Sequence, residues 1–187
     1  RIRAGGAGMN VMRKEEFYTV DDIYALPEGE RAELIDGRIY YMAPPGWKHQ
    51  KLSMFLSMEI SSYIKKAGGG CEILAAPFAV FLNADDLNYV EPDISVICDQ
   101  SKLDEKGCHG APDWIIEIVS PGSRTMDYMT KLFKYRTAGV REYWIVDPEK
   151  SMVMVYAFEQ DRAEQYLFGT DIPVGIYDGF QINLGTQ

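Results

Sequence analysis

The stretch DWIIEIVS, residues 113–120, decides the fold because its residues 114–119 are apolar on both faces apart from one carboxylate. Such a run is typical of a strand buried in the middle of a sheet. Glu117 interrupts it three residues before Ser120-Pro121-Gly122, where the strand must end. An unpartnered buried carboxylate costs several kcal/mol. Glu117 therefore predicts a compensating cation, a metal, or an exposed strand end in a cleft.

A second run, YVEPDISVIC at residues 89–98, has the same feature. Asp93 lies between Pro92 and apolar residues, and a proline is confined to a sheet edge or a bulge, where a side chain can be re-aimed. If the two strands are neighbours, a loop of about fourteen residues joins them. Asp93 and Glu117 then converge on an oxygen-rich site for a hard divalent cation, Mg²⁺, for which Mn²⁺ can substitute.

A helix predicted from about Thr125 to Ala138, ended by Gly139, supplies the third part. Its polar face carries Asp127, Lys131 and Lys134, and its other face, predicted to pack in the core, carries Met129, Leu132 and Phe133. A lysine beside a metal-bound water can orient that water or neutralise the charge that grows on a scissile phosphate. This chemistry is phosphodiester hydrolysis.

The rest of the chain mixes helices and strands. The predicted elements are a short helix from Thr19 to Leu26, a hairpin in 31–43 turning at Asp36-Gly37, a helix whose apolar residues run from Leu52 to Ile64, strands at 71–76, 78–83, 142–147 and 152–158, and short strands after Gln165. They indicate an α/β or α+β fold.

At these residues the chain resembles the PD-(D/E)XK nuclease superfamily, through Pro92-Asp93 and then Glu117-Ile118-Val119. Val119 stands where that motif usually has its lysine. The Uma-two family of restriction endonucleases is similar in carrying the lysine on the next helix. The phrases AELIDGRI, APDWIIEIVSPGSRTMDYMTKLFKY and AGVREYWIVDP extend the likeness over most of the chain.

The resemblance implies a restriction-endonuclease-like fold, with a mixed central sheet flanked by helices and extra β-hairpins in the N- and C-terminal parts. It implies metal binding by Asp93 and Glu117, with Lys131 as the catalytic lysine and Lys134 in reserve. Glu33, on the first hairpin, and His49, at the start of the long helix, are possible additional site residues.

Structural roles remain open for the same residues. Glu117 could pair with a lysine or arginine at a strand end, and Asp93 could cap the turn that Pro92 imposes. Lys131 could be solvated or paired with Asp127 four residues earlier. Glu33 could be an ordinary acid on a half-exposed strand, and His49 a surface histidine.

Charge is distributed unevenly along the 187 residues. The net charge of −9 argues against a basic coat protein for nucleic acids. Against the single acid Asp127, five cations lie between residues 120 and 141: Arg124, Lys131, Lys134, Arg136 and Arg141. This local excess predicts one basic face.

The sequence shows neither a run long enough to span a membrane nor a secretory leader, so we expect a cytoplasmic protein. Three cysteines at irregular spacing are expected to be reduced. Zinc binding by Cys98, Cys108 and His109 is disfavoured, because no paired-cysteine motif is present. We expect a flexible leader or cloning remnant at 1–12 and a single domain at 13–187.

Three functions follow as hypotheses. The first is a magnesium-dependent endonuclease acting on DNA, expected as a homodimer because a duplex offers two strands to cut. The second is a catalytically impaired nuclease-fold module that binds nucleic acid or protein, which Val119 and the acidity favour. The third is a phosphoesterase acting on small substrates.

Overall fold

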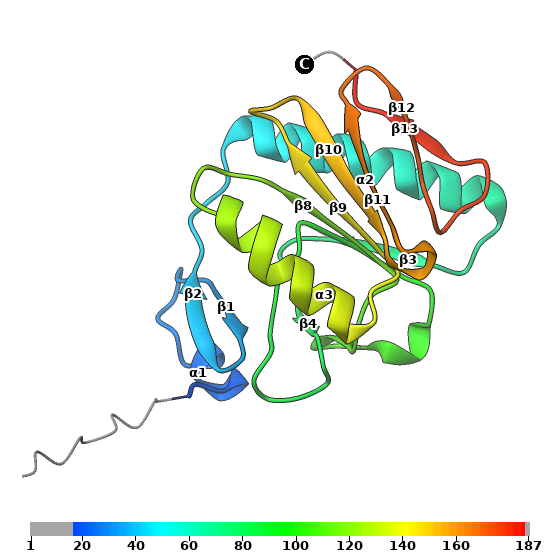
Figure 1. Ribbon diagram of the computed structural model, residues 1–187. Helices are drawn as coiled ribbons and strands as arrows, with labels where there is room; N and C mark the ends of the chain where they lie inside the picture. The colour runs from blue at the N-terminus through cyan, green and yellow to red at the C-terminus, as the bar shows by residue number, and fades with distance from the viewer. Residues whose placement is uncertain (1–16, 186–187) are drawn as a thin grey trace, which may run out of the picture.

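The computed structural model describes residues 17–185 (Figure 1). The leader expected at 1–12 lies outside these residues. A six-stranded central sheet has the order β11 (Arg162–Leu167), β10 (Met152–Ala157), β9 (Glu142–Asp147), β8 (Trp114–Ile118), β5 (Ile94–Ile97) and β3 (Glu72–Ala75). Only β8 and β9 pair in parallel, because the helix between them provides the crossover, and the other neighbours are antiparallel. The predicted mixed central sheet is confirmed.

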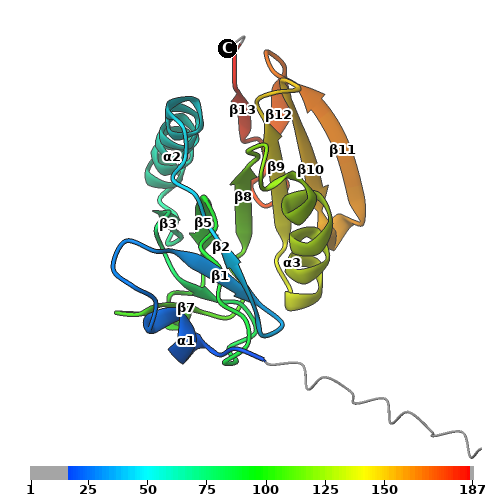
Figure 2. The ribbon, with the colours of Figure 1, turned by 90° about the vertical axis from the view of Figure 1, so that its left-hand side faces the viewer.

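Helices cover both faces of this sheet (Figure 2). On one face lies α2 (Trp47–Ala67), and on the other lie a π-helical turn, η2 (Met126–Lys131), and α3 (Leu132–Ala138). Strand β8 alternates between the two layers: Trp114 and Ile116 pack in the α2 core and Ile115 in the α3 core. Because side chains alternate across a strand, Glu117 points toward the helix that carries Lys131.

The N-terminal part is the predicted helix and hairpin. Helix α1 (Val20–Tyr24) starts at Thr19, whose backbone N–H donates to the Asp22 carboxylate. Strands β1 (Ala32–Ile35) and β2 (Arg38–Tyr41) pair around Asp36 and Gly37, which both have positive φ (50° and 73°). These are the angles that a tight two-residue hairpin turn demands. All four residues of β1 are buried, so this strand is more enclosed than the sequence suggested.

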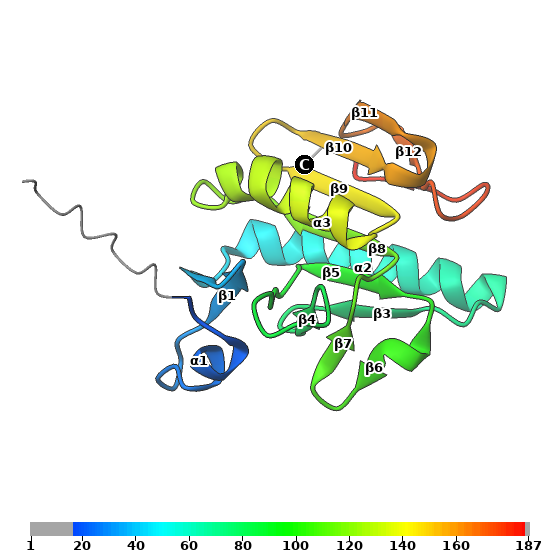
Figure 3. The same cartoon turned by 60° about the horizontal axis from the view of Figure 1, so that its bottom comes forward.

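Short strands add a second, smaller sheet (Figure 3). The predicted strand at 78–83 contracts to β4 (Val80–Phe81), which pairs with β7 (Gly107–His109) and through it with β6 (Leu103–Asp104). Strands β6 and β7 were not predicted, since two- and three-residue strands have no detectable periodicity. The remaining elements are η1 (Gln100–Lys102), η3 (Phe158–Gln160), β12 (Asp171–Pro173) and β13 (Gln181–Asn183).

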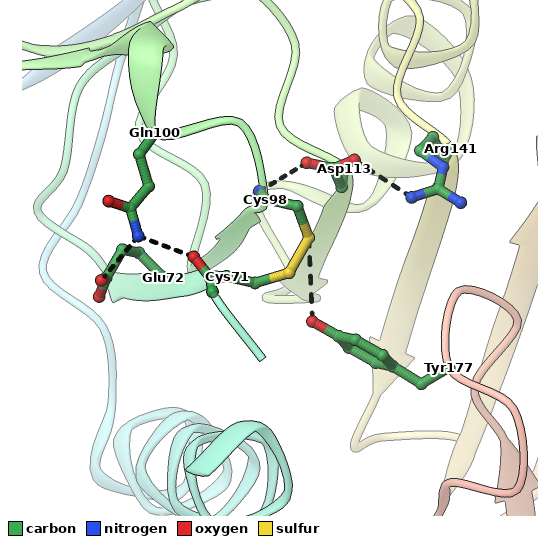
Figure 4. The surroundings of a disulfide bond; sticks show 8 residues. Cys71, Glu72, Cys98, Gln100, Asp113, Arg141 and Tyr177 are labelled. Atoms are coloured by element: carbon green, nitrogen blue, oxygen red, sulfur yellow. Dashed lines mark hydrogen bonds and ion pairs between the residues drawn. A yellow bond between two sulfur atoms is a disulfide. The ribbon is translucent and has the colours of Figure 1, made fainter. Parts of the chain in front are cut away.

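The expectation of three reduced cysteines is wrong. Cys71 and Cys98 form a disulfide (Figure 4). Cys71 precedes β3 and Cys98 follows β5, and these antiparallel strands pair Glu72 with Ile97, so the next residues out stand opposite each other. Cys spacing alone could not reveal this, because the pairing depends on strand register. Cys108 is free and buried.

The outward face of the helix was also misassigned. Met129 and Phe133, predicted for the core, are each 67% exposed. The face toward the sheet instead carries Asp127, Lys131 and Tyr135, all buried. The two faces were grouped as predicted, but the ion pairs of Lys131 with Glu33 and Glu117 turn the polar face toward the sheet and the apolar one to solvent. Within residues 17–185, no helix combines the length and the hydropathy that crossing a bilayer requires.

Candidate active site

Glu117 is the centre of a buried polar cluster between β8 and α3. Only 4% of the residue is exposed. Its Oε1 accepts hydrogen bonds from Lys131 Nζ at 2.9 Å and from the Tyr135 hydroxyl at 2.6 Å, and its Oε2 accepts one from the Asp93 backbone N–H at 3.4 Å. Tyr135 was not singled out from the sequence, although it lies one helical turn after Lys131. Lys131 at the end of η2 and Tyr135 on α3 thus hold one oxygen of this carboxylate, and the other is left to the backbone N–H of Asp93.

Lys131 links Glu117 to the N-terminal hairpin. Its Nζ lies 2.8 Å from Glu33 Oε2 and 3.9 Å from Asp127 Oδ1, and the residue is 5% exposed. Glu33 is itself buried on β1 and accepts a hydrogen bond from the backbone N–H of Glu91 at 3.0 Å. The reading of Lys131 as a solvated surface lysine is therefore excluded, and Glu33 belongs to the cluster.

Asp93 approaches Glu117 from the start of β5. Its Oδ2 accepts a hydrogen bond from the Ile118 backbone N–H at 2.7 Å and lies 3.1 Å from His49 Nε2. The two side chains keep 19% and 16% exposure, so this side of the cluster is its more open side. His49, on the first turn of α2, therefore holds the Asp93 carboxylate rather than lying free on the surface.

Like charges dominate the electrostatics of the cluster. Glu33, Glu117 and Asp127 surround the ammonium of Lys131, and Asp93 lies beside Glu117. Burial, opposed by Lys131, raises the pKa of Glu117 to about 8 and that of Asp127 to about 6. Burial lowers the pKa of Lys131, but the surrounding acids outweigh it and leave that pKa well above its usual value. Lys131 is thus a permanent cation in a site with excess negative charge.

The pKa of His49 is the result of opposing effects. Burial lowers it, but the hydrogen bond to Asp93 and the charge of that carboxylate outweigh burial and leave the pKa raised. Near neutral pH, His49 therefore favours donating from Nε2 to Asp93.

Lys134 does not join the cluster. Its ammonium binds the carboxylate of Asp36 at the exposed turn of the β1–β2 hairpin, 2.5 Å away. Of the two lysines considered on this helix, the structure brings only Lys131 to Asp93 and Glu117.

The predicted basic face around residues 120–141 is wrong. Acids from distant parts of the chain neutralise the cations: Arg124 pairs with Asp147 and Glu149, Lys131 with Glu33 and Glu117, Lys134 with Asp36, Arg136 with Asp161, and Arg141 with Asp113 and Glu159. All of these acids are more than ten residues away from their partners along the chain, so a count within one segment could not reveal the pairing.

The donor set of the cluster suits an oxygen-seeking divalent cation. Within residues 17–185, no three His, Cys, Asp or Glu side chains converge as ligands on one point. Mg²⁺, however, is commonly held by one or two carboxylates, with water and substrate phosphate completing the shell. Asp93 and Glu117 are such a pair, and a bound cation would offset the burial and, after it, the neighbouring acids that raise the pKa of Glu117. These residues fit a magnesium or manganese ion.

Comparisons with known proteins agree with this fold. The sequence model of the Uma2 family, described as "Putative restriction endonuclease", matches residues 15–185. The uncharacterized protein slr1290 of Synechocystis sp. is 26% identical over 133 residues, covering 71% of this chain and 68% of that relative. A crystal structure of "a putative nuclease belonging to DUF820" from Anabaena variabilis matches with a TM-score of 0.69 at 24% identity, covering 89% of this chain and 94% of the other.

Proposed function

Since the chain belongs to the Uma2 family, we propose that it is a metal-dependent endonuclease that hydrolyses phosphodiester bonds of DNA. The observation that carries the proposal is the meeting of Asp93, Glu117 and Lys131 from three separate elements. Two acids and a lysine with excess negative charge form an arrangement suited to a cation and a phosphate.

In this proposal Asp93 and Glu117 hold Mg²⁺ or Mn²⁺. When bound, the cation lowers the pKa of a water molecule and polarises the scissile phosphate. The backbone N–H of Ile118 and the imidazole of His49 orient Asp93 toward Glu117. Fixing the ligands in this way increases metal affinity, because less ordering remains for the binding step.

Lys131 acts as a fixed positive charge. Its raised pKa keeps the ammonium protonated, which is incompatible with a role as general base. Glu33 and Asp127 hold it beside Glu117, where it can donate a hydrogen bond to the phosphate or to the attacking water. In this proposal, Lys131 on the helix takes the role of the lysine that the motif usually has at the position of Val119.

A plasmid assay tests the proposal. Wild-type protein should convert supercoiled DNA to the nicked form with Mg²⁺ or Mn²⁺ and not with EDTA, and Asp93→Asn should abolish this conversion. Asp99→Asn, which removes an equal charge at an exposed position, is the matched control and should cleave like wild type. An RNA substrate in parallel distinguishes the two nucleic acids. Equal nicking by Asp93→Asn would contradict the proposal.

A second function is favoured by one observation. Lys131 and Tyr135 already engage one oxygen of Glu117, which is almost fully enclosed. A closed cluster of this kind suits a catalytically impaired nuclease-fold module that binds nucleic acid or protein. Calorimetry with MgCl₂ and MnCl₂ separates the two, because absent metal binding together with retained DNA binding would favour the impaired module.

Cleavage of both strands of a duplex calls for two sites, so the proposal includes a homodimer with twofold symmetry. Light scattering at several concentrations measures the mass. If the protein cuts both strands while it has the mass of one chain under cleavage conditions, the homodimer is contradicted but the nuclease activity is not.

A further inference from the structure

The outer face of α2 carries the positive charge that the α3 region lacks. Lys48, Lys51, Lys65 and Lys66 are exposed, and within residues 17–185 none of them forms an ion pair with an acid. The only acid of the helix is Glu59. Helix α2 therefore has a net charge of +3 in a chain of net charge −9.

An exposed aromatic ring stands at the start of this face. Trp47 is 71% exposed, whereas Trp114 and Trp144 are completely buried. The ammonium of Lys48 lies 5.7 Å from the centre of the Trp47 ring. We call Trp47, Lys48, Lys51, Lys65 and Lys66 together the α2 lysine face.

Helical geometry turns both ends of this face to solvent, and between them the same side of the helix carries the exposed Met54 and Met58. At about 100° per residue, Trp47 and Lys65 point in one direction and Lys51 lies about 40° from them. The residues that point inward are Leu52, Leu56, Ile60 and Ile64, all in the core. From Lys48 to Lys66 the face extends roughly 27 Å, and Figure 2 shows α2 as the outermost element on its side.

The α2 lysine face begins at the candidate active site. His49, which follows Lys48 directly, holds the Asp93 carboxylate at 3.1 Å. His49 points inward, away from Trp47 and Lys65, so a polyanion lying along α2 would reach the cluster by crossing the N-terminal end of the helix.

We propose that the α2 lysine face binds the phosphate backbone of DNA and directs it to Asp93 and Glu117, with Trp47 stacking on a base or sugar of the bound strand. Identifying the polyanion as the substrate rests on the proposed function. Lysines contact phosphates without reading sequence, and aromatic rings stack on bases of any kind. The surface therefore provides affinity rather than sequence selection.

Two other partners fit the face less well. A bilayer requires a broad apolar helical face to insert. The broad apolar face of α2 is buried against the sheet, and its exposed apolar residues, Trp47, Met54 and Met58, lie on the same side as the lysines. A second copy would bring two helices of net charge +3 together. DNA is favoured because it matches both the charge and the exposed aromatic ring.

Trp47 provides the readout for the test, because acrylamide quenching of tryptophan emission distinguishes it from the two buried tryptophans. In EDTA, a short DNA duplex with a single-stranded end should protect Trp47 from acrylamide. Lys51→Gln with Lys65→Gln should weaken DNA binding at least 10-fold and lower the slope of log K against log salt by about two. The matched control, Lys106→Gln with Lys150→Gln, removes the same charge elsewhere and should leave binding unchanged.

Several outcomes would overturn the proposal. One is an equal loss of DNA affinity in both pairs of substitutions. Another is protection of Trp47 from acrylamide by anionic phospholipid vesicles but not by DNA. A third is a Trp47 already shielded from acrylamide in free protein that has the mass of two chains. Because binding is measured without metal, it is separate from cleavage. If DNA binds as proposed but is not nicked, the proposed nuclease activity is contradicted. If DNA is nicked without binding to the α2 lysine face, only the role of that face is contradicted.

Discussion

Glu117 and Glu142 are buried carboxylates on neighbouring parallel strands, β8 and β9, yet their surroundings differ. Burial raises the pKa of both. Glu142 accepts hydrogen bonds from the Trp144 indole N–H at 2.6 Å and the Ile176 backbone N–H at 2.8 Å, so it anchors the segment before β13. Glu117 instead shares Lys131 with Glu33 and lies beside Asp93.

The difference shows that burial alone does not identify a functional carboxylate. Neutral donors satisfy Glu142, whose role is structural. Around Glu117 the acids outnumber the cation, an arrangement that costs stability and that a bound metal would relieve. Crowding of like charges is therefore the better guide to the site.

The largest expected effect compares the two glutamates directly. Glu117→Gln should lower metal-dependent plasmid nicking by about 10³-fold, because it removes a proposed metal ligand. Glu142→Gln should retain the wild-type rate per folded molecule, although mismatched hydrogen bonds cost it about 1–3 kcal/mol of stability. Equal losses of nicking in both variants would contradict the distinction between a functional Glu117 and a structural Glu142.

Removing the cation tests whether the acids around it repel one another. Lys131→Met should destabilise the protein by about 3–5 kcal/mol at neutral pH, since Glu33 and Glu117 lose their shared partner. The control is Lys134→Met, whose ammonium pairs with an exposed acid and whose loss should cost less than about 1 kcal/mol. Urea denaturation measures both. A similar small cost for the two lysines would contradict the account.

The support given to Asp93 should have a smaller effect. His49→Ala should lower nicking by about 10–100-fold, as is usual for residues that orient a metal ligand, with Mg²⁺ affinity reduced in parallel. His109→Ala, which removes the histidine paired with Asp104, should cleave like wild type. A loss of nicking with unchanged metal affinity would argue against this positioning role.

The remaining expected effect is a pH dependence of stability. The pKa of Glu117, about 8 in the folded protein, lies above its ordinary value of 4.5, so the folded state binds more protons than the unfolded state between these values. The free energy of unfolding should therefore fall as pH rises through this range. Each kcal/mol that is lost should lower Tm by about 2–4 °C. Glu117→Gln should flatten the fall, and saturating Mg²⁺ should oppose it. An equal fall in Glu117→Gln would place the effect elsewhere, with Glu142 the first candidate.

The sequence was informative where local chemistry decides structure. Asp36-Gly37 predicted the hairpin, and the misplaced carboxylates Asp93 and Glu117 predicted a shared cluster. The same reasoning passed over Glu142, because its partner Ile176 lies far along the chain.

Long-range contacts decided the remaining features. The remaining features are the ion partners of the arginines, the register that joins Cys71 to Cys98, and the pairing of Lys131 with Glu33 and Glu117, which leaves Phe133 exposed. All depend on packing between distant segments. Patterns within one segment do not contain this information.

Crystals grown with Mn²⁺ test the central claim most directly, because the anomalous signal of manganese locates the ion independently of activity. We predict a peak between Asp93 and Glu117, within direct coordination distance of an oxygen of each carboxylate, and its absence in crystals of Asp93→Asn. Manganese bound elsewhere, or none at this cluster at saturating concentration, would contradict a metal-dependent site here.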